Sequence, residues 1–376
     1  MLLLALLTLH VQPSPPVVLG PRATSNQRPV YRFVSHERGV PAAKLRFRCA
    51  FDRPKLHPCR RRYRQRLGVG RHVLRVVAVD PSGHRSRVTR VRVRILQGTG
   101  PRLRRIEVGG HPFSLAEADG AVWVANFLAG TVQRIDPATN RVVTQIRVGG
   151  QPYGLAVAPG AVWVGNNSRN DVARIDTATN RLVARVTAGD RPIGLGYDNG
   201  SVWVVDFGDG GVTHIDAATN AVLAHAAIPG EHEDVAAGFG SIWVPSEEGT
   251  LTRIDPATLA VRATITVGND PDFVLIAQGS VWTTAYADDV ISRVDPVTNA
   301  VAGTLRVPTG LQGLAFDGTD FWAANYGGGT LLRLDPATGK ARAHWTTDGG
   351  PRDVLLAFGS VWVANSTSTS VQRLSP

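Results

Sequence analysis

Several features that mark particular protein classes are scarce or absent in this chain of 376 residues. Only two cysteines occur, Cys49 and Cys59, and neither His36 nor His57 completes a recognisable zinc-ligand spacing with them. No apolar run approaches the roughly 20 residues that span a bilayer, so no transmembrane segment is expected. There is neither a Gly-x-Ser-x-Gly elbow nor a glycine-rich phosphate loop opening a helix, which argues against the enzymes built on those motifs.

Acidic residues are scarce in one part of the chain only. Residues 1–105 contain 24 Lys and Arg against 3 Asp and Glu, whereas residues 106–376 contain 17 basic and 27 acidic residues. The overall net charge of +11 therefore describes neither part. A chain of this length has room for two domains, and these two parts have opposite charge.

The first residues combine a short apolar run with prolines. Met1 to Leu9 is almost wholly apolar, and Pro13, Pro15 and Pro16 follow. We interpret residues 1–28 as a signal-like apolar segment with a Pro-rich tail, although the basic segment that normally precedes such a run is missing. The alternative is a disordered tail without a role in export. Export predicts a secreted or cell-surface protein, in which a single cysteine pair suggests a disulfide.

Residues 29–97 alternate apolar and polar side chains, with arginines on one face, which predicts β-strands. The phrases Phe47-Arg48-Cys49-Ala50-Phe51-Asp52 and Val77-Ala78-Val79-Asp80-Pro81-Ser82-Gly83, with Cys59 and His72 between them, resemble those of bacterial immunoglobulin-like modules. The resemblance implies a small antiparallel sandwich with a Cys49–Cys59 bridge. Residues 98–102 form a Gly-Pro linker.

Seven tryptophans recur at intervals of 40, 40, 40, 39, 40 and 40 residues: Trp123, Trp163, Trp203, Trp243, Trp282, Trp322 and Trp362. Each unit contains four strand-like runs, which is typical of a β-propeller blade. We therefore predict an all-β protein in which a seven-bladed β-propeller at 103–376 follows the immunoglobulin-like sandwich. The last unit stops after its third strand, and the strand at 103–108 is expected to close blade seven.

The repeat phrase combines Gly120-Ala121-Val122-Trp123-Val124-Ala125-Asn126 with Ile135-Asp136-Pro137-Ala138-Thr139-Asn140. It resembles the YVTN-type propeller repeats, in the wider group that includes NHL-like and virginiamycin B lyase-like proteins. This resemblance implies the fold. It leaves function open, because the scaffold hosts sensors, surface binders, structural proteins and a few enzymes.

Residues that recur in nearly every blade are expected to be scaffold. The tryptophans should pack between blades, and the aspartate of each Ile-Asp-Pro-Ala-Thr-Asn phrase should cap its own turn. Function is expected in the two loops per blade that reach the face around the channel mouth. Blades four and five stand out there, because residues 226–304 hold 11 acidic and 3 basic residues.

The predicted binding residues are those that blades four, five and seven place on this face: Glu231, His232, Glu233, Asp234, Asp270, Asp272, Tyr286, Arg352 and Asp353. Four interpretations compete. The acidic residues form a solvated rim, or Glu233, Asp234 and Asp272 bind a divalent cation, Mg²⁺ or Ca²⁺. His232 is a candidate catalytic residue in the third interpretation, and the fourth is docking to a basic partner, such as the protein's own N-terminal module.

We expect an extracytoplasmic protein that recognises a ligand, a carbohydrate or a protein without catalysis. The basic module would tether it, with an anionic cell-surface polymer as a candidate partner. Nucleic acid is not expected, because export removes the protein from it. The alternatives are a metal-dependent lyase or hydrolase of the virginiamycin B lyase-like type, and a structural envelope protein.

Overall fold

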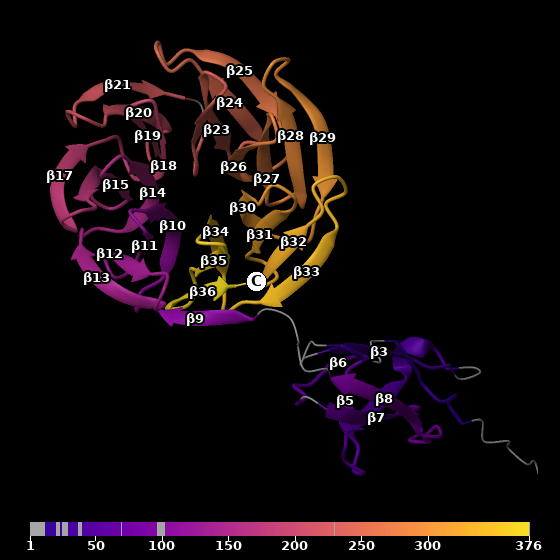
Figure 1. The fold of residues 1–376 in the computed structure, drawn as a ribbon. Helices are drawn as coiled ribbons and strands as arrows, with labels where there is room; N and C mark the ends of the chain where they lie inside the picture. The colour runs from indigo at the N-terminus through magenta and orange to yellow at the C-terminus, as the bar shows by residue number, and fades with distance from the viewer. Residues whose placement is uncertain are drawn as a thin grey trace, which may run out of the picture. The chain divides into compact units, whose positions relative to one another are not determined.

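The computed structural model describes residues 12–19, 23–24, 29–36, 40–68, 70–95, 102–228 and 230–375. The chain divides into two compact units, Met1–Gly100 and Pro101–Pro376 (Figure 1). No helix in the described ranges is long and apolar enough to cross a membrane. Most of the predicted signal-like segment and of the linker lies outside the described residues.

The described residues of the first unit form two sheets and one short 3-10 helix, η1 (Ala42–Lys44). One sheet has the strand order β1 (Val17–Leu19), β3 (Val30–Val34) and β6 (Arg62–Arg64); the other has the order β2 (Ala23–Thr24), β8 (Thr89–Ile95), β7 (Gly70–Val79), β4 (Arg46–Phe51) and β5 (His57–Cys59). Because β1 and β2 pair within these sheets, the first unit begins before the boundary predicted at residue 29. Pairing is antiparallel except between β2 and β8.

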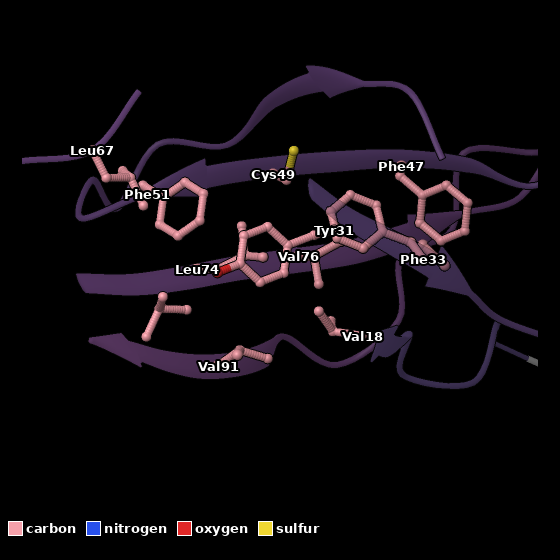
Figure 2. Packing of buried hydrophobic residues seen from close by; sticks show 12 residues of the cluster. Val18, Tyr31, Phe33, Phe47, Cys49, Phe51, Leu67, Leu74, Val76 and Val91 are labelled. Carbon is pink, nitrogen blue, oxygen red and sulfur yellow. The ribbon is translucent and has the colours of Figure 1, made fainter. Parts of the chain in front are cut away.

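A single hydrophobic cluster lies between the two sheets (Figure 2). Tyr31 and Phe33 of β3 contribute from one sheet, and Phe47 of β4 and Leu74 of β7 contribute from the other. The predicted alternation is visible in β8, where valines 91 and 93 are buried and the arginines between and beside them are exposed. Burial of one face of each sheet holds this small unit together.

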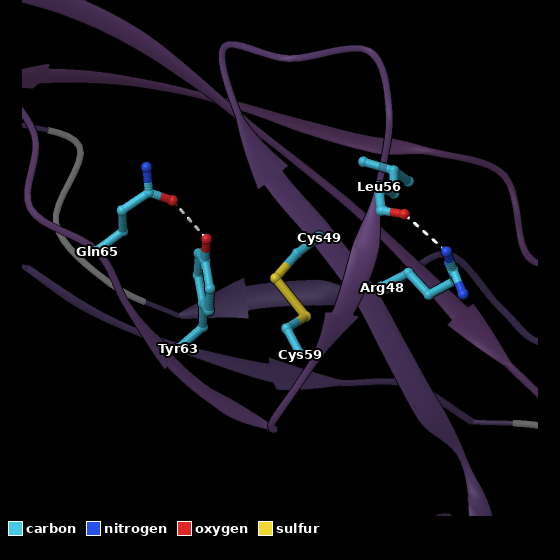
Figure 3. Close-up of a disulfide and its surroundings, with 6 residues drawn as sticks. All are labelled: Arg48, Cys49, Leu56, Cys59, Tyr63 and Gln65. Carbon is cyan, nitrogen blue, oxygen red and sulfur yellow. Dashed lines mark hydrogen bonds between the residues drawn. A yellow bond between two sulfur atoms is a disulfide. The ribbon is translucent and has the colours of Figure 1, made fainter.

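The two cysteines form the predicted disulfide, which joins β4 to β5 (Figure 3). Other residues of the immunoglobulin-like phrase also contact one another. One carboxylate oxygen of Asp52 accepts a hydrogen bond from the backbone amide of Val73 at 2.7 Å, and the other lies 2.6 Å from Nδ1 of His72. The phrase therefore fixes the β4–β7 pairing and the bridge beside it.

The second unit consists of seven four-stranded antiparallel sheets, numbered one to seven in chain order. Their strands, from the innermost outward, are β10 (Pro112–Ala118), β11 (Ala121–Asn126), β12 (Thr131–Asp136) and β13 (Arg141–Arg147); β14 (Pro152–Ala158), β15 (Ala161–Asn166), β16 (Asp171–Asp176) and β17 (Arg181–Thr187); β18 (Pro192–Asp198), β19 (Ser201–Asp206), β20 (Gly211–Asp216) and β21 (Val222–Ala227); β22 (Ala236–Gly238), β23 (Ser241–Ser246), β24 (Thr250–Ile254) and β25 (Val261–Thr266); β26 (Pro271–Ala277), β27 (Ser280–Ala285), β28 (Val290–Asp295) and β29 (Ala300–Arg306); β30 (Leu311–Phe316), β31 (Phe321–Asn325), β32 (Thr330–Leu334) and β33 (Ala341–Thr346); and β34 (Pro351–Ala357), β35 (Ser360–Asn365), β36 (Ser370–Leu374) and β9 (Leu103–Glu107).

These sheets stand in a ring with the first strand of each next to the centre, a β-propeller-like arrangement (Figure 1). The seventh sheet combines both ends of the unit, because β9 pairs with β36 from Leu103↔Leu374 to Glu107↔Ser370. This pairing covers the edge of β36 and joins the last sheet to the segment that precedes the first.

The repeated residues act as scaffold. The seven repeat tryptophans are between 0% and 7% exposed and belong to the hydrophobic clusters between neighbouring sheets. In the turn after β12, the carboxylate of Asp136 accepts hydrogen bonds from the amide of Ala138 and the hydroxyl of Thr139, each at 2.8 Å. Asp216, Asp255, Asp295 and Asp335 accept the equivalent amide hydrogen bond. Both observations agree with the structural roles expected from the repeat.

Candidate ligand-binding site at the channel

The innermost strands of six sheets, and in sheet four the segment just before β22, line a central cavity of about 370 Å³. One residue from each sheet, ten positions before its repeat tryptophan, faces this cavity: Phe113, Tyr153, Ile193, Glu233, Asp272, Gln312 and Arg352. Sheets one to three contribute aromatic and aliphatic side chains, whereas sheets four to seven contribute charged and amide side chains. The cavity is therefore apolar on one side and polar on the other.

Arg352 of sheet seven contacts side chains of three other sheets. Its Nη2 donates hydrogen bonds to Oε2 of Glu233 at 2.6 Å and to the hydroxyl of Tyr153, which itself donates to Glu233. Its Cζ lies 5.0 Å from the ring centre of Phe113 and 4.9 Å from that of Tyr153. The guanidinium thus binds a carboxylate and two aromatic rings, and it links sheets one, two, four and seven.

The carboxyl groups of Glu233 and Asp272 lie close to each other and to this guanidinium. Burial, followed by the charge of Glu233 and a hydrogen bond to it, raises the pKa of Asp272 to about 8. The amide nitrogen of Gln312 donates to Asp272 at 2.8 Å. The raised pKa favours the protonated form of Asp272 at neutral pH, and Glu233 forms the ion pair with Arg352. Burial lowers the pKa of Arg352, but the opposing groups, Tyr153 first and then Glu233, outweigh it and raise the pKa.

Asp234 and Asp353 bind the backbone of the next sheet. The carboxylate of Asp234 accepts from the amide of Val274 at 3.0 Å, and that of Asp353 accepts from the amide of Leu115 at 2.8 Å. Burial raises the pKa of Asp234 to about 7 and also raises that of Asp353. Gly154 stands at the same place in sheet two, where a Cβ would lie 2.2 Å from a carbonyl oxygen of the next sheet. These two aspartates are therefore primarily links between sheets.

His232 is fully buried and does not line the cavity. Its Nδ1 lies 3.1 Å from the carbonyl oxygen of Pro245, and its Nε2 lies 3.2 Å from that of Ile228. Five other sheets have a buried proline at this position, for example Pro192 in sheet three. His232 therefore fills a structural position and cannot reach a substrate in the cavity, which disfavours the catalytic hypothesis.

A second group lies on the loops above the cavity. We call the carboxyl groups of Glu231, Glu247 and Asp270 the acidic rim. The amide of Glu247 donates to the carbonyl of Glu231 at 3.0 Å, and the amide of Tyr286 donates to the carbonyl of Asp270 at 2.8 Å. In sheets four and five, the two loops that the sequence predicted to share one face are therefore in contact. Burial, and then repulsion from neighbouring carboxylates, raises the pKa of Glu247 and of Asp270.

No group of three or more His, Cys, Asp or Glu side chains within the described ranges is arranged to hold a metal ion. The structure brings Glu233 and Asp272 together, but Asp234 turns to the backbone of the next sheet. Glu233 is already paired with Arg352, and Asp272 accepts a hydrogen bond from the amide nitrogen of Gln312. This donor set fits an internal ion pair better than the Mg²⁺ or Ca²⁺ site predicted from the sequence.

The predicted binding residues therefore separate into three sets. Glu233, Asp272 and Arg352 meet in the cavity, Glu231, Asp270 and Tyr286 lie on the rim, and His232, Asp234 and Asp353 are structural. The sequence-based set omitted Phe113, Gln312 and Glu247, and it did not select Tyr153. Phe113, Gln312 and Tyr153 could have been found by taking the residue ten positions before each repeat tryptophan.

The fold and the cavity define an all-β protein with a β-propeller-like ring. No protein-family model and no curated protein matches the chain. Among solved structures, it is similar to a chain of Kuenenia stuttgartiensis hydrazine synthase, with a TM-score of 0.63 and 17% identity over 75% of this chain and 99% of that one. It is also similar to the computationally designed protein Ika8, with a TM-score of 0.57 and 14% identity over 82% and 94%. At these identities the likeness concerns the fold alone.

Proposed function

We propose that the second unit is a seven-bladed propeller of the YVTN/NHL-like group and that the protein is a non-catalytic recognition protein outside the cytoplasm. Its ligand carries positive charge and binds at the acidic rim and the channel mouth. The immunoglobulin-like first unit serves as a basic tether to an anionic surface polymer. The carrying observation is the cluster of Glu231, Glu247 and Asp270 on the loops of sheets four and five, carboxyl groups that have no ion-pair partner among the described residues.

The balance of charge at the mouth supports a cationic ligand. Arg352 neutralises Glu233 within the cavity, whereas Glu231, Glu247 and Asp270 have no ion-pair partner among the described residues. A cation placed among them would be attracted by all three carboxylates and would relieve the repulsion that, after burial, raises the pKa of Glu247. An anionic ligand would add to it.

Aromatic side chains beside these carboxyl groups favour an organic cation. Tyr286 lies half-buried next to Asp270 on the rim. Phe113 and Tyr153 already hold the guanidinium of Arg352 at 5.0 and 4.9 Å, which is how aromatic rings bind ammonium and guanidinium groups. A lysine or arginine side chain of a partner, or a polyamine, has this chemistry.

The disulfide supports a location outside the cytoplasm. Cys49 and Cys59 are joined, and structural disulfides persist mainly in oxidising compartments. The exposed arginines of β8 give the first unit a strongly basic face, which suits anionic surface polymers. The same basic face repels a cationic probe, so binding of such a probe reports on the second unit.

Titration calorimetry with a hexalysine peptide tests the proposal. We expect binding at low ionic strength that weakens as salt is added, because exposed charges are screened. The triple variant Glu231→Gln, Glu247→Gln, Asp270→Asn should weaken binding about tenfold or more. Glu248→Gln is the matched control, because this exposed residue lies in the same loop outside the acidic rim. Equal affinity for wild type and triple variant, or binding of a neutral oligosaccharide in place of hexalysine, would overturn the proposal.

A further inference from the structure

A second cavity lies on the side of the ring away from the channel mouth. In sheets two, four and seven an arginine of the third strand covers the repeat tryptophan and reaches the turn of the next sheet. The Cζ of Arg253 lies 5.0 Å from the ring centre of Trp243, and its Nη1 donates to the carbonyl of Pro296 at 2.6 Å and to Oδ1 of Asn299 at 2.8 Å. Both acceptors belong to the turn between β28 and β29. This turn closes the space between sheets four and five.

The same contact joins sheets seven and one. Arg373 covers Trp362 at 4.8 Å, donates to Oδ1 of Asn140 at 3.0 Å and also donates to the carbonyl of Pro137. A turn of the Asp-Pro-Ala-Thr-Asn type therefore supplies one backbone carbonyl and one side-chain amide oxygen to the arginine of the preceding sheet.

Sheet seven has no turn of this type that the arginine of sheet six could bind. Its third strand, β36, and its outer strand, β9, come from opposite ends of the unit, so no such turn connects them. Arg333 of sheet six covers Trp322 at 5.5 Å, and its Nε donates to Asp320. No carbonyl of the next sheet accepts from it among the described residues. A cavity of about 630 Å³, here called the seam cavity, lies at this place.

The seam cavity is lined by aromatic side chains. Trp345 of β33 stacks on Trp322 with ring centres 5.4 Å apart and planes 26° apart. Trp345 pairs with Leu331 as Leu305 pairs with Ile291 in sheet five, so a tryptophan here replaces an aliphatic side chain of the repeat. Two stacked indoles form a flat wall that suits a planar apolar molecule.

The polar groups of the cavity select against an anion. Arg333 donates to Asp320 of its own sheet and, like Arg293 of sheet five, has no acceptor in the next sheet among the described residues. Asp317 accepts from the indole of Trp322 at 2.7 Å, and Glu117 also lines the cavity. Their carboxylates would repel a ligand carboxylate, whereas a neutral carbonyl or amide oxygen would take the place of the missing turn.

We propose that the seam cavity binds a small, neutral, planar molecule that stacks on Trp345 and accepts a hydrogen bond from Arg333 through a carbonyl or amide oxygen. This site is separate from the channel mouth and does not depend on the function proposed above. Its size is within the range of sites for small organic ligands.

Titration with 2-naphthamide, observed by calorimetry and by quenching of tryptophan fluorescence, tests the assignment. We expect saturable binding by the wild type and at least tenfold weaker binding by Trp345→Leu and by Arg333→Gln. Trp345→Leu should fold, because Leu305 occupies the equivalent position in sheet five. Arg293→Gln is the matched control, because Arg293 covers Trp282 at 5.7 Å in sheet five, away from the seam. 2-Naphthoate, the anionic probe of the same shape, should bind more weakly than the amide.

Two results would overturn the proposal. One is the absence of saturable binding of 2-naphthamide by a wild type that melts cooperatively. The other is binding that Trp345→Leu and Arg333→Gln leave unchanged, which would place the probe elsewhere in the molecule.

Discussion

Replacing Arg352 with glutamine removes the positive charge that pairs with Glu233 in the channel. The two side chains are only 18% and 20% exposed, and their nitrogen and oxygen lie 2.6 Å apart. Removing one partner of a buried pair costs about 3–5 kcal/mol, because the other charge is left without a counter-ion. Partial access to the channel reduces this cost, so we expect a loss of about 3 kcal/mol and a fall in melting temperature of roughly 6 °C.

Urea unfolding followed by tryptophan fluorescence measures this loss. All eight tryptophans lie in the second unit, so the signal reports on that unit alone. Arg105→Gln is the matched control, because Arg105 pairs with Glu107 and Asp348 on the surface, where ion pairs contribute less than about 1 kcal/mol. The double variant Arg352→Gln, Glu233→Gln should recover part of the stability, since it leaves no unpaired charge. A loss below about 1 kcal/mol for Arg352→Gln, or no recovery in the double variant, would refute the reasoning.

Three further predictions concern the same ring. The pKa of Asp272 rises from its ordinary 3.8 to about 8, so this group stabilises the fold below about pH 4 and loses that contribution as the pH rises toward 8. The variant Asp272→Asn does not titrate, so between these pH values its stability relative to wild type should increase by up to about 1.4 kcal/mol per pH unit. Urea unfolding at several pH values measures this difference. Asp353→Ala should cost about 1–3 kcal/mol by the same assay, because the amide of Leu115 loses its acceptor, whereas Asp353→Asn should cost less. The effect of millimolar Mg²⁺ or Ca²⁺ on the melting temperature should be the same in wild type and in Glu233→Gln, since Glu233 is paired with Arg352.

Each of these predictions has a contrary outcome. A stability difference for Asp272→Asn that does not vary with pH would show that the folded state holds no extra proton at this site. Equal losses for the alanine and asparagine variants at Asp353 would mean that the acceptor is unimportant. A melting temperature that rises with Mg²⁺ or Ca²⁺, and no longer rises after Glu233→Gln, would restore the cation site.

The repeat allowed much of the second unit to be predicted. The tryptophan spacing located the strands, because a buried side chain in every copy fixes the register of each sheet. The orphan strand before the first repeat and the missing outer strand of the last predicted a partnership that β9 and β36 form. In the first unit, the boundary at residue 29 was too late, because the short strands β1 and β2 lie in proline-containing sequence without a long alternating pattern.

The candidate site was predicted less completely, because its residues come from sheets that are far apart in the sequence and meet only when the ring closes. Alignment on the tryptophans identified sheets four and five as exceptions, but it could not show which side chains face the cavity. Glu233 and Arg352 are 119 residues apart and meet only because the ring closes. His232 and Asp234, the neighbours of Glu233, point to backbone groups that a linear sequence does not place beside them.

Hydrogen–deuterium exchange with and without hexalysine tests the central claim most directly, because it locates the bound cation on the chain. The account predicts protection confined to the loops around Glu231, Glu247 and Asp270, with no change in the first unit or at the turns on the opposite side of the ring. Protection elsewhere, or none in these loops at a saturating concentration of the peptide, would contradict it.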